Sequence, residues 1–177
     1  GEYHLNQNNM NTSKTVILTI AILIALVILI MTIQLLSKKT KNKNSEDGKL
    51  KLSYGIWFIT FFLSGSLVMS KVVFVLNESI DNIYKTIPTK SLFESFKMGS
   101  LFIGLGIVWL LLWYFILNIL SVLIMGKRNY VKEIETNNYS YFLVKGIILI
   151  GFTICLLPVF EIILREFMPN IQIPFYH

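Results

Sequence analysis

The sequence has few of the residues that keep a domain in water or that carry out chemistry. Charged residues make up 15% of its 177 residues, whereas soluble domains typically contain about 25%. Cysteine occurs once, as Cys155 within an apolar run, so it has no partner for a disulfide or a metal site. The two histidines, His4 and His177, lie at opposite ends of the chain. These shortages exclude a secreted enzyme and predict that the chain binds no metal.

Known catalytic motifs are also missing. The sequence has no glycine-rich phosphate loop, no H-E-x-x-H pair, no G-x-S-x-G elbow and no paired intramembrane aspartates. We therefore expect a protein that is not an enzyme and uses no cofactor. No aromatic residue is interleaved with the lysines that precede Tyr54, which argues against a nucleic-acid partner.

Apolar sequence is abundant instead. Hydrophobic residues make up 54% of the chain, and the mean hydropathy is +0.64. They are collected into four long runs, and each run is near or above the ~20 residues that cross a bilayer core as a helix. The predicted fold is an all-α integral membrane protein, a single four-helix membrane domain without a sizeable soluble domain. The expected transmembrane helices cover about 16–37, 52–76, 99–125 and 139–167 of residues 1–177.

Basic residues are distributed unevenly between the connections. The loops 38–51 and 126–138, with Lys145 just inside the next run, contain about ten Lys and Arg residues, and the other side has about five. The positive-inside rule then places these loops in the cytoplasm, with both termini and the segment 77–98 outside. The bias towards Lys, Asn and Ile favours a bacterial inner (plasma) membrane, with an organellar inner membrane as the alternative.

The loop 38–51 is rich in lysine. Its plainer role is to hold the loop in the cytoplasm. The alternative is contact with acidic lipid headgroups, which is worth about 1 kcal/mol per basic residue near an anionic surface. The residues that would make these contacts are Lys38, Lys39, Lys41, Lys43, Lys49 and Lys51.

Of the charged residues inside predicted spans, where a charge costs about 2.5–3.5 kcal/mol at the helix centre, we single out two. Lys71 and Glu161 lie about five and six residues inside the outer ends of the second and fourth spans. One hypothesis is an ion pair between these helices that fixes how they dock. In the second, Lys71 reaches the headgroups and Glu161 pairs with Arg165 one turn later. A proton or ion site is the third.

Small and polar residues form a seam along the third span. They alternate with apolar residues at spacings of three and four, which is typical of a packed helix interface. Asn and Ser can bond to a neighbouring helix, and small residues allow backbones to approach closely. A polar pore is the alternative interpretation, although few polar side chains are available to line it. The seam residues are Gly104, Tyr114, Asn118 and Ser121, and the second span adds Ser66 and Ser70 with small-xxx-small spacing.

Local signals refine these boundaries. Ser91 and Glu94 have the spacing of a capping box, so the third helix is expected to begin at Ser91. The segment 77–98 mixes apolar and charged residues, which predicts that it lies along the membrane surface or covers a neighbouring subunit. Pro158 predicts a bend in the fourth helix, with a gating element as the alternative.

The expected function follows from the membrane location and the lack of catalytic motifs. We expect a non-enzymatic, small polytopic membrane subunit that acts by lateral helix–helix assembly in a membrane complex. Its partners would be membrane lipids and other integral membrane subunits, or copies of itself. The alternative is a small oligomeric channel or pore-forming effector.

Overall fold

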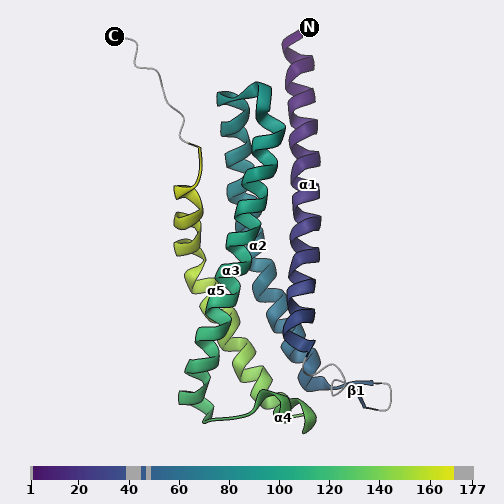
Figure 1. Cartoon of the computed structure of the whole chain (residues 1–177), viewed down its shortest axis with the longest axis vertical. Helices are drawn as coiled ribbons and strands as arrows, with labels where there is room; N and C mark the ends of the chain where they lie inside the picture. Colours follow the sequence, from purple (N-terminus) through teal and green to yellow (C-terminus); the bar gives the residue numbers. More distant parts are fainter. Residues whose placement is uncertain (1, 39–44, 47–48, 170–177) are drawn as a thin grey trace.

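The computed structural model describes residues 2–38, 45–46 and 49–169. Four long helices lie side by side and run alternately up and down (Figure 1). Within the described residues, these four helices are long and apolar enough to cross a membrane, which confirms the predicted all-α fold and points to an integral membrane protein. The elements are α1 (Glu2–Ser37), β1 (Ser45–Glu46), β2 (Lys49–Leu50), α2 (Leu52–Thr86), η2 (Pro88–Lys90), α3 (Ser91–Met125), α4 (Tyr130–Glu135) and α5 (Tyr139–Glu166).

The two ends of the bundle differ. We call the end where η2 joins α2 to α3 the turn end, and the opposite end, which carries α4 and the short β1–β2 hairpin, the α4 end (Figure 1). Helices α1 and α3 both run from the turn end to the α4 end, whereas α2 and α5 run the other way.

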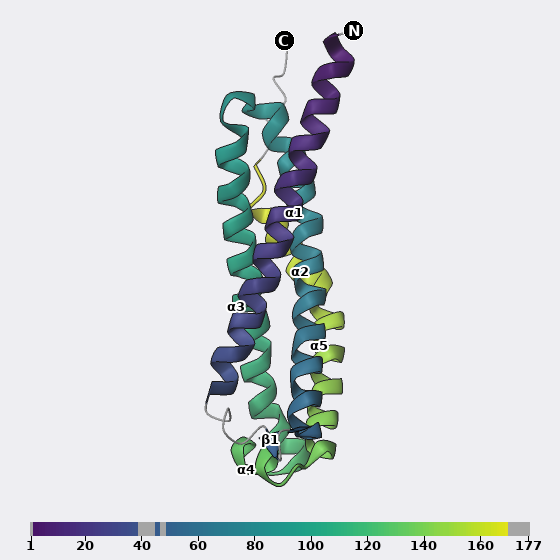
Figure 2. The same ribbon diagram turned by 90° about the vertical axis from the view of Figure 1, so that its right-hand side faces the viewer.

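Helix α2 is central, because it packs against α1, α3 and α5. Helix α1 joins it through a single row of buried residues in which every fourth residue faces inward. Such a row is inclined by about 26° to the helix axis, so α1 crosses α2 obliquely (Figure 2). The buried row consists of Ile17, Ala21, Ala25, Leu29 and Ile33.

Two glycines set how closely these helices approach. A Cβ atom at Gly65 of α2 would overlap the side chain of Leu29 on α1, and a Cβ atom at Gly146 of α5 would overlap Thr60 on α2. At Gly146 a side chain would meet Cβ of the branched Thr60 and push the helices apart, whereas at Gly65 it would meet only the end of the flexible Leu29 side chain.

The segment 77–98 is not a separate element, because it forms the end of α2, the turn η2 and the start of α3. Helix α2 continues to Thr86 because Ile80 and Ile83 extend its buried face at helical spacing. Helix α3 begins at Ser91 as expected, but Ser91 continues the turn of η2 with helical dihedral angles (φ −56°, ψ −39°) instead of forming an extended cap. With 35 residues, α2 is about 52 Å long and exceeds the ~30 Å hydrocarbon core.

The connection 126–138 is more ordered than a predicted loop. It contains α4, whose start is capped by Asn129, since the side chain accepts a hydrogen bond from the backbone N of Val131 at 3.0 Å. Asn138 caps α5, and Asn137 Oδ1 accepts a hydrogen bond from the backbone N of Ser53 near the start of α2. Asparagine side chains in this connection therefore fix the starts of three helices.

Candidate functional site

Four charged side chains join α2 to α5 towards the turn end. Lys71 Nζ lies 2.7 Å from Glu161 Oε2, across the two helices. Arg165, one turn after Glu161, lies 2.9 Å from Glu161 Oε1 and 2.5 Å from Glu78 Oε2 of α2. The structure thus brings Lys71, Glu161 and Arg165 together, with Glu161 contacting both cations. The two cations and two carboxylates of this network have no net formal charge.

Helix α1 has its own ion pair at the same end. Lys14 Nζ lies 2.5 Å from Asp81 Oδ1 of α2. Helix α2 is therefore ion-paired with both α1 and α5.

The predicted seam on α3 divides into two parts. Tyr114 and Ser121 are buried, and the Tyr114 ring packs edge-on against Phe61 of α2 with 5.1 Å between ring centres. Gly104, in contrast, is exposed, and a Cβ atom there would meet nothing within 4 Å. The close approach to α2 occurs at Gly106 instead, where a Cβ atom would lie 3.0 Å from Val72. Within the described part of this chain, Gly104 therefore makes no close contact with another helix.

Ser66 and Ser70 do not make the tight contact between α1 and α2. Ser66 is half-buried and Ser70 is exposed. Both line a shallow apolar groove beside Ala25 of α1, whereas the close approach lies at the neighbouring Gly65. The close approach of α1 to α2 therefore lies next to the Ser66 and Ser70 pair, not at it.

Lys145 is the charged residue that sequence reasoning missed. Its side chain is buried, with 6% of the residue exposed, and its Nζ donates a hydrogen bond to Asn118 Oδ1 of the seam. Lys145 Nζ also lies 5.6 Å from the ring centres of Tyr114 and Tyr141 and 6.0 Å from that of Tyr130. A signal was present, because Lys145 lies four residues from Tyr141 and Leu149 on one buried face of α5.

A polar cavity opens beside Lys145 at the α4 end. Its volume is about 520 Å³, and it lies between the end of α1, the second half of α3, α4 and the start of α5. The buried residues of the lining, Tyr114, Ser121, Tyr141 and Lys145, carry polar groups, whereas the apolar Leu35, Phe115 and Val122 are exposed. The polar lining residues are Tyr114, Asn118, Ser121, Arg128, Tyr130, Tyr141 and Lys145, and the apolar ones include Leu35, Leu36, Phe115, Val122 and Val131.

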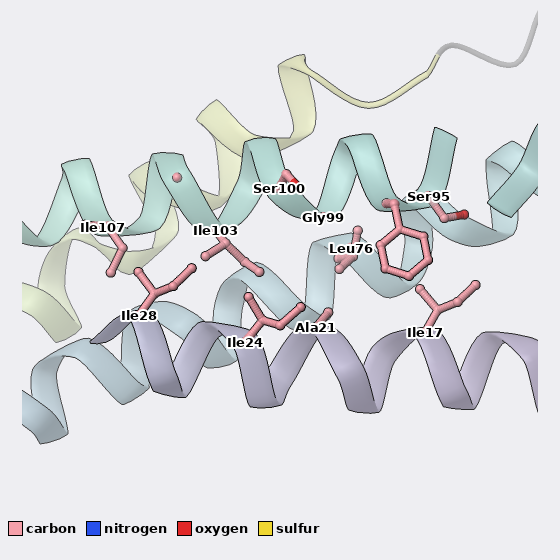
Figure 3. A pocket seen from close by; sticks show the side chains of 12 residues that line it. Ile17, Ala21, Ile24, Ile28, Leu76, Ser95, Gly99, Ser100, Ile103 and Ile107 are labelled. Atoms are coloured by element: carbon pink, nitrogen blue, oxygen red, sulfur yellow. The ribbon is translucent and has the colours of Figure 1, made fainter. Parts of the chain in front are cut away.

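An apolar groove lies between α1 and α3 nearer the turn end. In Figure 3 the side chains of the two helices point towards one another across a gap, with Leu76 of α2 behind them. The groove has a volume of about 300 Å³ and is almost entirely apolar. Ser100 and Gly104, four residues apart on α3, line it and are exposed. Ser95 also lines it, and its buried hydroxyl has no hydrogen-bond partner among the described residues.

The lysine-rich loop is only partly described. Lys38 and Lys49 are exposed, and Lys51 donates a hydrogen bond to the backbone oxygen of Glu135 at 2.9 Å. The remaining predicted headgroup contacts, Lys39, Lys41 and Lys43, lie outside the described residues.

Comparison with known proteins finds no family model, curated protein or solved structure that matches this chain. In the part of the chain that the structure describes, no group of three or more His, Cys, Asp or Glu residues is placed to hold a metal ion. The geometry of the bundle is therefore the basis for inferring its function.

Proposed function

We propose that this chain is a non-enzymatic subunit of a membrane complex and acts by lateral helix–helix assembly. The carrying observation is the groove between α1 and α3, where Ser100 and Gly104 remain exposed instead of packing within the chain. Small residues four apart allow another helix to approach closely, and this packing drives association in lipid, where burial of apolar surface gives little.

The groove has the dimensions and chemistry of a helix-binding surface. Its lining extends along α1 from Ile17 to Ile28, which corresponds to about 17 Å or three helical turns. The hydroxyl of Ser95 at one end of the groove is buried and has no partner within the described part of the chain, and a polar group on the incoming helix would satisfy it. We therefore propose one transmembrane helix of a partner subunit, or of a second copy of this chain, as the occupant.

Photo-crosslinking in cells tests this proposal. Benzoylphenylalanine at Phe96, which lines the groove, is expected to crosslink to a partner polypeptide or to a second copy. The matched control is Phe93, which lies on the same helix, is 70% exposed and does not line the groove. Equal crosslinking from the two positions would contradict docking at the groove. A closed ring of copies that conducts ions in planar bilayers would support the channel instead.

We further propose that the α4 end faces the cytoplasm of a bacterial inner membrane. The excess of Lys and Arg in 38–51 and 126–138 supports this orientation. In a Cys155→Ser background, an impermeant maleimide should label Thr89→Cys in intact cells and Lys127→Cys only after permeabilisation. Both positions are exposed, so the opposite pattern would contradict the orientation.

A further inference from the structure

The cavity beside Lys145 contains a cation that the protein does not neutralise. Among the described residues, no carboxylate forms an ion pair with Lys145, and its hydrogen-bond partner is the neutral amide of Asn118. The described lining of the cavity includes no Asp or Glu. Arg128, the other cation of the lining, is already paired with Glu133 at 3.3 Å. The cavity therefore has an excess of positive charge that comes from Lys145.

An uncompensated buried ammonium is costly unless something stabilises its charge. The three tyrosine rings around Lys145 supply cation–π attraction, which is worth about 2 kcal/mol when desolvated. Burying an isolated ion costs several kcal/mol even after relaxation. The rings and one amide oxygen do not replace a counter-ion, so an anion that enters the cavity would gain the interaction that the chain leaves unused.

We propose that this cavity binds the phosphate group of an anionic molecule. Lys145 would supply the charge, and the hydroxyl group of Tyr141 in the lining would donate a hydrogen bond to a phosphate oxygen. The volume of about 520 Å³ lies within the usual range of small-molecule sites, about 300–1,000 Å³.

The shape of the cavity favours a lipid as the source of the phosphate. Tyr114, Ser121, Tyr141 and Lys145 of its lining are buried, whereas the apolar residues Leu35 of α1 and Phe115 and Val122 of α3 are exposed. An anionic phospholipid places a phosphate next to acyl chains, which matches buried polar residues beside exposed apolar ones. Lys145 lies six residues after the first residue of α5, about 9 Å along the helix, a depth that a headgroup phosphate reaches at a membrane boundary. This site does not depend on the α1–α3 groove.

Native mass spectrometry of the full chain in detergent micelles provides the test. The protein is titrated with phosphatidylglycerol and, separately, with phosphatidylcholine of the same acyl chains. We expect at least tenfold tighter binding of the anionic lipid. Inorganic phosphate is added in a third titration. If phosphate alone saturates the site and displaces the lipid, the source is a soluble anion; if it does not compete, the source is the lipid headgroup.

Two variants and one control locate the site. Lys145→Met should lose the preference for the anionic lipid. Lys127→Met, which removes an exposed lysine at the same end of the bundle, should change binding less than twofold. Asn118→Asp places a carboxylate beside the ammonium with little change of shape, so it should also abolish the preference even if Lys145→Met folds poorly. Equal binding of both lipids by the wild type, or an unchanged preference in Asn118→Asp, would overturn the proposal.

Discussion

Lys71 and Lys145 are both lysines on helices that are long and apolar enough to cross a membrane, yet the bundle accommodates them in different ways. Lys71 meets the carboxylate of Glu161 at 2.7 Å within a network of balanced charge. Lys145 is more deeply buried, and the bundle surrounds it with an amide and three tyrosine rings. The first arrangement uses charge to hold two helices together. The second leaves a charge available to a ligand.

The role of a charge on such a helix depends on the partners of that charge and not on its depth. A compensated cation is part of the helix interface, because removing its partner leaves an isolated charge. An uncompensated cation beside a cavity is a binding-site hypothesis. Substitutions that exchange or remove these partners test the distinction.

The largest effect is expected at Glu161. Glu161→Gln leaves Lys71 without its carboxylate, whereas Arg165 keeps Glu78. The thermal unfolding temperature of the detergent-solubilised protein should fall further than for substitutions at the α2–α5 glycine contact or at the tyrosine rings. Adding Lys71→Met to Glu161→Gln should recover most of the loss, because no isolated charge remains. A double variant no more stable than Glu161→Gln would contradict the compensating role of this pair.

A smaller effect is expected where α5 approaches α2 between the two lysines. Gly146→Ala would overlap Thr60 and should lower the free energy of unfolding by about 1–3 kcal/mol. Gly151→Ala on the same helix meets nothing within 4 Å and should be neutral or stabilising by up to about 1 kcal/mol. Thr60→Ala should partly rescue Gly146→Ala. Thermal unfolding measures all three, and equal effects of the two glycine variants would contradict the close approach.

The smallest effect concerns the aromatic rings around Lys145. Tyr141→Leu keeps an apolar side chain but removes one ring, and should lower the free energy of unfolding by about 0.5–2 kcal/mol. Tyr139→Leu is the control, because Tyr139 is 51% exposed and is not one of the three rings around the ammonium. A double-mutant cycle of Tyr141→Leu with Lys145→Met measures the coupling. A coupling energy of zero would mean that the ring does not stabilise the ammonium.

The four long helices and their alternating directions were predictable from the sequence, because a long apolar run in lipid can satisfy its backbone hydrogen bonds only as a helix or in a closed barrel. The contact of Lys71 with Glu161 was one of the hypotheses, since the equal depth of two opposite charges follows from residue spacing alone. The extension of α2 to Thr86 was missed, although Ile80 and Ile83 continue the helical period. The polar residues between these isoleucines concealed the helical spacing.

Other features depend on tertiary structure and have no local signal. The packing at Gly65 and Gly146, and its absence at Gly104, depend on where α1 and α5 cross α2. The role of Lys145 depends on Asn118, 27 residues earlier in the chain, and on α4, which sequence reasoning treated as a loop. From the sequence, Lys145 contributed only to the positive-inside prediction of orientation, because residue spacing does not reveal which side chains surround a charge.

Lateral assembly through the α1–α3 groove is tested by the mass of the intact, detergent-purified assembly. We expect a mass greater than one chain for the wild type and for Gly151→Leu, whose position is exposed and away from the groove. Gly104→Leu, which fills the groove, should give the mass of a single chain. A wild-type protein that is a single chain, or an assembly unchanged by Gly104→Leu, would contradict it.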